Sequence, residues 1–134
     1  MLKLVIVSML AVLERFPGLK IVSAENDIGW AGSYIQRLDH TMRKHGPRYN
    51  IDLPMMPSDY FHRNVFCTFM EDEAGLRIWD VIGAQNLLWS NDYPHFDSTW
   101  PHSQEVTARQ FQGVPDHVKA MILAGNVKSL YHIN

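Results

Sequence analysis

The sequence contains a single cysteine, Cys67, so it cannot form an intrachain disulfide framework or a cysteine-based zinc cluster. It also lacks the glycine-rich phosphate loops of the Gly-x-Gly-x-x-Gly and Gly-x-x-x-x-Gly-Lys types. The Gly-x-Ser-x-Gly turn that carries a serine nucleophile is missing as well. These absences argue against a glycine-rich phosphate-binding loop and against serine acyl transfer. The low cysteine content predicts a reducing, cytoplasmic location.

The sequence also lacks an excess of either charge, since it contains 12 Lys and Arg residues and 14 Asp and Glu residues, for a formal net charge of −2. We therefore expect no nucleic-acid partner. Residues 2–13 are largely apolar, but they are too few to span a bilayer, and Glu14 and Arg15 follow without a small-residue cleavage site. This segment predicts a buried helix and no membrane partner. With 46% hydrophobic residues, the 134-residue chain is expected to form one domain over residues 1–134.

Three stretches repeat the order of a short apolar strand, a polar acidic segment and a helix. The expected strands cover residues 19–24, 64–70 and 87–90. The expected helices cover residues 30–45 and 75–82, with a third after Pro101 and a closing helix from Pro115 to a stop signal at Gly125 and Asn126. Strands that alternate with helices pair in parallel through right-handed crossovers. The sequence therefore predicts an α/β fold of three successive βα units.

Acidic residues follow each expected strand: Glu25 after the first, residues 71–73 after the second, and Asp92 after the third. The carboxyl ends of parallel strands meet at one edge of a sheet, where α/β enzymes place their chemistry. His95 lies three residues beyond Asp92, and this pairing favours a functional site over a structural loop. Trp30 and Glu71 are candidates for lining a substrate pocket, with a packed aromatic and a solvated loop as the respective alternatives.

In chain order, the segments FPGLKIV, ENDIGW with RLDH, PSDYFHRNVFCTF, EDEAGL, IGAQNLLWSNDYPHFDSTWPHS and GNVKSLY resemble the amidohydrolase-related family. Its members are metal-dependent hydrolases and nonoxidative decarboxylases, among them the aminocarboxymuconate semialdehyde and resorcylate decarboxylases. The resemblance implies the C-terminal portion of a (β/α)8 TIM barrel, of about three βα units with parallel strands.

The same resemblance implies roles for three residues. Asp92, after the eighth barrel strand, is expected to bind a divalent metal or the water that the metal activates. Glu25, at the end of the sixth strand, is expected to transfer protons; some family members have His at this place and others have Glu. His95 is expected to support Asp92. Zinc is the first expectation for the metal, with manganese or another divalent ion as alternatives.

The family's His-x-His metal pair is absent, and Asp92 alone cannot hold a catalytic ion in a site of three or more ligands. We therefore expect that this chain alone does not retain the metal, and that it is a truncated piece of a larger enzyme. A partial barrel leaves strand edges unpaired, so the expected partners are the missing N-terminal barrel part or another copy, besides a small-molecule substrate. The predicted activity is hydrolysis or nonoxidative decarboxylation of a small carboxylate or cyclic substrate. The alternative is a catalytically silent fragment or interaction module.

Overall fold

A computed structural model describes residues 2–133, with side chains described from residue 9 onward. The strands are β1 (Ile21–Ser23), β2 (Val65–Phe69) and β3 (Leu87–Trp89). The helices are α1 (Leu2–Arg15), α2 (Gly29–His45), α3 (Pro57–Asn64), α4 (Glu73–Leu76), α5 (Trp79–Ile82), α6 (Ser103–Gln110), α7 (Asp116–Ala120) and α8 (Asn126–Tyr131). Shorter turns are η1 (Pro47–Tyr49), η2 (Ala84–Asn86) and η3 (Met121–Gly125). None of the helices within residues 2–133 is long and apolar enough to cross a membrane.

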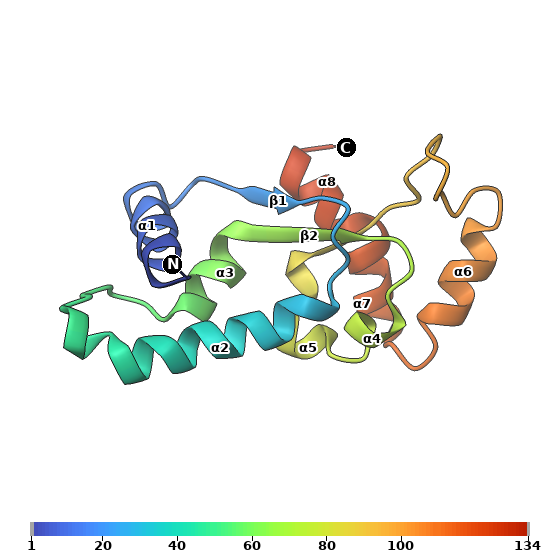
Figure 1. The fold of residues 1–134 in the computed structure, drawn as a ribbon. Coiled ribbons are helices and arrows are strands. Elements are labelled where there is room, and N and C mark those ends of the chain that lie inside the picture. The colour runs from blue at the N-terminus through green and yellow to red at the C-terminus, as the bar shows by residue number, and fades with distance from the viewer. Residues whose placement is uncertain (1, 134) are drawn as a thin grey trace.

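The three strands form one parallel sheet in the order β1-β2-β3, which confirms the predicted α/β fold of part of a barrel. Ile21 lies opposite Val65, and Cys67 lies opposite Leu87. The structure shortens each predicted strand by one to three residues. Figure 1 shows α2 and α5 along one side of the sheet and α6 beyond the strand ends, far from α1.

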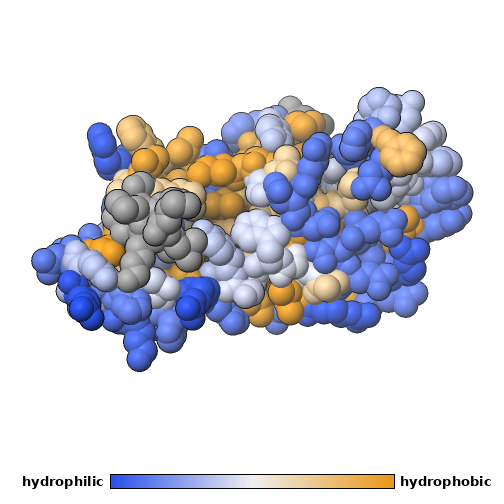
Figure 2. All heavy atoms as spheres, in the orientation of Figure 1, coloured by the Kyte–Doolittle hydropathy of each residue, from blue (hydrophilic) through white to orange (hydrophobic). Residues whose placement is uncertain are grey.

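One face of the sheet carries the hydrophobic core, because side chains along a strand alternate between faces. In β2, Val65, Cys67 and Phe69 are buried, whereas the two residues between them are only half-buried. The buried side packs against α2, α3 and the α7 region through a cluster that includes Ile28, Ile35, Phe61, Leu76, Ile82, Leu87, Phe111, Val118 and Ile122. Figure 2 shows hydrophobic surface over β1 and the segment before it. Phe16 and Leu19 of that segment are exposed.

Two helical regions differ from the prediction. Helix α3 is not among the helices expected from the sequence; Pro57 occupies its first turn, where a missing amide donor is harmless. Asp59 caps this helix by accepting from the Met56 amide at 2.9 Å. The single helix expected over residues 75–82 is instead split into α4 and α5. The backbone at Ile78, with φ −122° and ψ 26°, departs from helical geometry between them.

The predicted stop of the closing helix at Gly125 and Asn126 is wrong. The helix begins at Asp116 with Pro115 as its N-cap, and it continues through a π-helical turn into α8. Gly125 has an ordinary helical φ of −60°, so it does not act as a C-cap. Asn126 is instead buried, and its amide group binds backbone carbonyls outside the helix. A tertiary contact therefore explains the asparagine that the sequence pattern assigned to a helix end.

Three buried asparagines join the successive βα units at the amino ends of the strands. Asn64, Asn86 and Asn126 are each at most 7% exposed, and each donates from Nδ2 to backbone carbonyls of an earlier segment. The acceptors are Pro17 and Leu19 for Asn64 (3.1 and 2.6 Å), His62 and Val65 for Asn86 (3.0 and 2.6 Å), and Ala84 and Leu87 for Asn126 (both 2.7 Å). Each link gives the amide group of a buried asparagine the acceptors that it needs.

Candidate active site

A cavity of about 240 Å³ lies at the carboxyl ends of the three strands. Its lining comes from the carboxyl end of β2 and the residue after it, and from the segments after β1 and β3, so all three βα units contribute. The lining residues are Glu25, Asp27, Thr68, Phe69, Met70, Ser90, Asp92, His95 and Asp97. Four of them are carboxylates and one is an imidazole. The cavity therefore gathers groups that can bind cations and transfer protons.

Asp92 and His95 form a directly bonded pair at this cavity. The distance from His95 Nδ1 to Asp92 Oδ2 is 2.8 Å, and the side chain of Asp92 is 21% exposed against 66% for His95. The His95 amide also donates to the Asp92 carbonyl at 2.9 Å, which closes a tight turn. Because Nδ1 donates to the carboxylate, the neutral imidazole keeps Nε2 as its acceptor. The pair thus fixes the direction in which the Asp92 carboxylate points.

The loop after β3 is held together by its own polar groups. The Asn91 carbonyl accepts from Ser98 Oγ at 2.7 Å and from the Thr99 amide at 3.1 Å. The Asn91 side chain accepts from the Tyr93 amide at 3.2 Å. These bonds draw the two ends of the loop together, so Asp92 occupies a defined place rather than the tip of an open loop.

The backbone is left-handed at three acidic residues of the cavity: Glu25, Asp27 and Asp92, with φ of 58°, 52° and 55°. Only five non-glycine residues in the described part of the chain have a positive φ, and these three make up the majority. Such conformations are unfavourable for residues with a Cβ and cluster at functional sites. Their concentration here distinguishes this cavity from the rest of the surface.

The loop after β1 is tied to β2 on both sides of Asn26. The Glu25 amide donates to Thr68 Oγ1 at 3.0 Å. Asp27 accepts a backbone hydrogen bond from Met70. Burial raises the pKa of the Asp27 carboxyl, the charge of Asp72 raises it further, and the Met70 bond opposes both effects. Asp27 therefore retains its proton to a higher pH than an ordinary aspartate.

The structure brings Glu25, Asp92 and His95 together at the cavity, but neither Trp30 nor Glu71 is among its lining residues. Trp30 is 39% exposed on α2, and its indole N–H donates to the Asp27 carbonyl at 3.0 Å. Glu71 Oε2 accepts from Arg109 Nη2 at 2.6 Å on the exposed surface. The two residues proposed to contact substrate thus have other partners in this structure.

Sequence reasoning did not identify Asp27, Thr68, Ser90 or Asp97 as lining residues. The signal for Thr68 was present, because strand alternation puts it on the face opposite the buried Cys67 and Phe69. No comparable signal marks Asp97, whose position depends on the course of the loop after β3.

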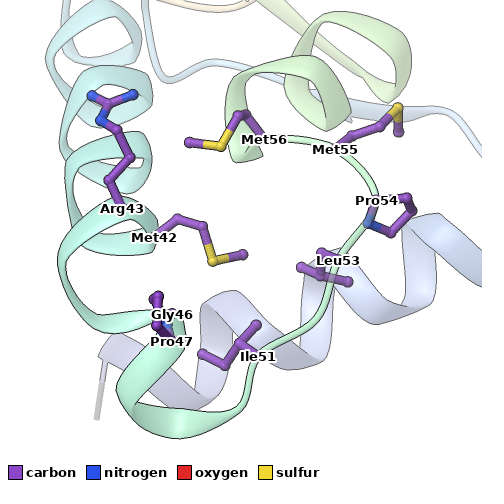
Figure 3. A pocket seen from close by; sticks show the side chains of 9 residues that line it. All are labelled: Met42, Arg43, Gly46, Pro47, Ile51, Leu53, Pro54, Met55 and Met56. Atoms are coloured by element: carbon purple, nitrogen blue, oxygen red, sulfur yellow. The ribbon is translucent and has the colours of Figure 1, made fainter.

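A second cavity, of about 290 Å³, lies between the end of α2 and the segment before α3. Figure 3 shows Met42, Ile51 and Leu53 pointing toward its interior, while Arg43 points away. Arg43 pairs with Asp39 at 3.9 Å. The lining holds no carboxylate, imidazole or thiol: it consists of Met42, Arg43, Gly46, Pro47, Ile51, Leu53, Pro54, Met55 and Met56. Although larger, this cavity has no group suited to acid–base or metal chemistry.

The carboxylates of the first cavity suit a divalent metal as individual ligands. Across residues 2–133, however, no group of three or more His, Cys, Asp or Glu side chains is arranged to hold a metal ion. Asp92 can supply one ligand, whereas protein sites for catalytic metals use three or more. The described residues therefore offer part of a metal shell and do not complete one.

Comparison with known proteins gives a consistent result. A family model described as amidohydrolase matches residues 4–133. A 5-carboxyvanillate decarboxylase from Sphingomonas paucimobilis matches with a TM-score of 0.77 and 31% identity, over 96% of this chain and 38% of that one. An amidohydrolase from Mycobacterium avium subsp. paratuberculosis matches with a TM-score of 0.75 and 27% identity, over 93% of this chain and 32% of that one.

A dihydroxybenzoic acid decarboxylase from a Polaromonas species, solved with bound manganese and the inhibitor 2-nitroresorcinol, has the same fold. Its TM-score is 0.66 at 19% identity, over 96% of this chain and 39% of that one. No curated protein sequence matches the chain. The chain spans only 32–39% of the length of these three structures.

Proposed function

Because the chain belongs to the amidohydrolase family, we propose that its cavity forms part of the active site of a metal-dependent enzyme. The enzyme would hydrolyse or nonoxidatively decarboxylate a small carboxylate or cyclic substrate. The observation that carries this proposal is the convergence of Glu25, Asp27 and Asp92 at the carboxyl ends of three parallel strands. The 31% identity to a 5-carboxyvanillate decarboxylase favours decarboxylation of an aromatic acid as the first reaction to test.

The site proposed here is shared with further barrel strands. Within the described residues, β1 and β3 each pair on one side only, with β2. An unpaired strand edge invites another strand, and a barrel closes only when all its edges are paired. We propose that this chain supplies the C-terminal barrel strands, and that the remaining strands come from the N-terminal part of a barrel or from another copy.

Asp92 would act as one metal ligand, held in place by the N–H of His95 Nδ1. A divalent ion bound there supplies positive charge that stabilises negative charge on substrate oxygens. Manganese in the Polaromonas enzyme supports a divalent ion, and both zinc and manganese are candidates for this chain.

Glu25 would carry the proton transfer. In decarboxylation, the bond from the ring carbon to the carboxylate breaks, carbon dioxide leaves, and the Glu25 carboxyl donates a proton to that carbon. In hydrolysis, the Glu25 carboxylate would instead accept a proton from the attacking water. Asp27 lies two residues away, and its raised pKa suits it to hold a proton near Glu25. Glu25 would thus be the proton donor at the cavity, and Asp27 would be a second acid beside it.

The competing proposal is a catalytically silent fragment or interaction module. It is favoured by the lack of a three-ligand group in the part of the chain that the structure describes. Metal binding separates the two proposals, because a silent module has no reason to bind a stoichiometric transition metal at Asp92.

The test is metal analysis after exposure of the purified chain to zinc or manganese, with and without the segment that completes the barrel. Carbon dioxide release from 5-carboxyvanillate and 2,6-dihydroxybenzoate is measured in the same samples. In the samples that contain the completing segment, we expect near-stoichiometric metal that is lost in Asp92→Ala and retained in the control Asp52→Ala, since Asp52 is exposed and outside the cavity. An equal amount of bound metal per chain in Asp92→Ala and wild type would refute the role of Asp92. No metal and no turnover in any sample would support the silent module.

A further inference from the structure

Asp72, just after β2, binds the start of a helix that lies 43 and 44 residues earlier in the chain. Its Oδ2 accepts from the Ile28 amide at 2.8 Å and from the Gly29 amide at 2.6 Å. Its Oδ1 accepts from the Gly75 amide at 2.7 Å. One carboxylate therefore holds the first turns of both α2 and α4.

These bonds meet a need that α2 does not satisfy itself. The first amides of a helix have no partner within the helix, and the side chain of the N-cap usually accepts from one of them. The N-cap of α2 is Ile28, which has no side-chain acceptor. Asp72 takes over that function from another unit, and its negative charge is favourable at the positive end of the helix.

Two glycines leave room for the Asp72 carboxylate at this contact. A Cβ at position 75 would lie 2.6 Å from Asp72 Oδ2 and 2.8 Å from the Gly29 nitrogen, closer than van der Waals contact permits. A Cβ at Gly29 would lie 3.3 Å from the same oxygen. Glycine at position 75 thus lets the carboxylate and the two helix starts approach each other.

The segment of Asp72 is itself fixed by neighbouring elements. The Met70 carbonyl accepts from Trp89 Nε1 of β3 at 3.0 Å and from Gln110 Nε2 of α6 at 2.8 Å. The Asp72 amide donates to Gln110 Oε1 at 3.4 Å. Asp72 therefore presents its carboxylate from a position that two other elements determine.

We propose that Asp72 is a positioning residue for the cavity, which holds the loop bearing Glu25 and Asp27 in its left-handed conformation. This loop is anchored at one end by the bond from the Glu25 amide to Thr68, and at the other by the bonds from Ile28 and Gly29 to Asp72. Loss of the second anchor removes the side-chain acceptor of the Ile28 and Gly29 amides, and leaves the bond from Trp30 Nε1 to the Asp27 carbonyl and the packing of Ile28 to hold this end of the loop. The effect on catalysis rests on the proposed function, whereas the effect on the loop does not.

The charge of Asp72 gives the proposal a readout that a purely structural contact would lack. Burial is the first cause of the raised pKa of Asp27, Asp72 is the second, and Asp97 adds a weaker contribution. Glu25 and Asp92 line the same cavity. Neutralising Asp72 removes one like charge beside Asp27, so the pKa of Asp27 should fall.

The test compares Asp72→Asn with the matched control Glu73→Gln in the full chain by NMR. Glu73 is the adjacent acid, but its carboxylate is exposed and pairs with Arg109 at 3.2 Å. In Asp72→Asn we expect the Ile28 and Gly29 amides to exchange with solvent at least about tenfold faster, because the negative charge and one of the two acceptor oxygens at position 72 are lost. We also expect a lower pKa for Asp27 in a carboxyl-carbon titration, and neither change in Glu73→Gln.

Wild-type exchange rates at both amides in a folded Asp72→Asn would overturn the proposal, as would an unchanged pKa of Asp27. If Asp72→Asn does not fold, Gly29→Ala serves as the second variant, since its Cβ crowds the carboxylate while the charge stays. Faster exchange at Ile28 is then expected, and an unchanged rate would overturn the proposal. These measurements need no metal or substrate, so an inactive enzyme would contradict the proposed function without affecting them.

Discussion

Replacing Asn86 by alanine is the most direct test of how the βα units hold together. Asn86, the last residue of η2, is fully buried, and its Nδ2 donates to the His62 and Val65 carbonyls at 3.0 and 2.6 Å. The alanine variant removes the Nδ2 group and with it both hydrogen bonds to these carbonyls.

The expected loss follows from these two bonds. A buried hydrogen bond contributes about 1 kcal/mol net, and an acceptor left unpaired costs about 1–3 kcal/mol. Asn86 Oδ1 is itself buried without a partner in the described residues, so its removal offsets part of the loss. We expect a decrease of about 2–4 kcal/mol in the free energy of unfolding. For a chain of this length, that corresponds to a Tm lower by roughly 8–15 °C.

Urea unfolding followed by tryptophan fluorescence measures this change, with Gln85→Ala as the control. Gln85 is the preceding residue in the same turn, but it is exposed, so its replacement should change stability by less than about 0.5 kcal/mol. If Asn86→Ala and Gln85→Ala unfold at the same urea concentration, the asparagine links do not stabilise the fold, and the reasoning is refuted.

Two further predictions concern ionisation. Cys67 is fully buried, and burial raises the pKa of its thiol to about 11, so a thiol-specific reagent should modify it only after denaturant is added; rapid labelling of the native chain would contradict this. Asp27 binds its proton more tightly in the folded than in the unfolded chain, so its ionisation lowers stability as pH rises above the ordinary value of 3.8. The free energy of unfolding of Asp27→Asn minus that of wild type should therefore increase from about pH 3 to about pH 7, as measured by urea unfolding. The same difference at both pH values would contradict this.

The strands could be predicted from the sequence because each is a short apolar run that ends in polar residues. Parallel pairing then followed from the alternation with helices, and it placed Glu25, Asp92 and His95 at one edge of the sheet. The sequence does not predict the direction in which a side chain at that edge points. Glu71 follows β2 as expected, but Arg109 of α6 holds its carboxylate on the outer surface.

Two of the failures share one physical cause, which is contact between residues far apart in the chain. Asn126 follows a glycine and was interpreted as a helix end, yet its amide group reaches carbonyls about forty residues earlier. Asp72 looked like a solvated acid in an acidic run, yet it caps α2 across 43 and 44 residues. Local patterns describe which backbone states are accessible, and they do not identify such distant partners.

The asparagine links have a direction, because each side chain reaches back to a segment that precedes it. During synthesis the amino-terminal part leaves the ribosome first. When each asparagine emerges, the carbonyls it needs have therefore already been made. The molecule can consequently be assembled in the order of translation, because the asparagine of each new unit donates to carbonyls that have already been made, and those carbonyls gain this donor only when the next unit emerges.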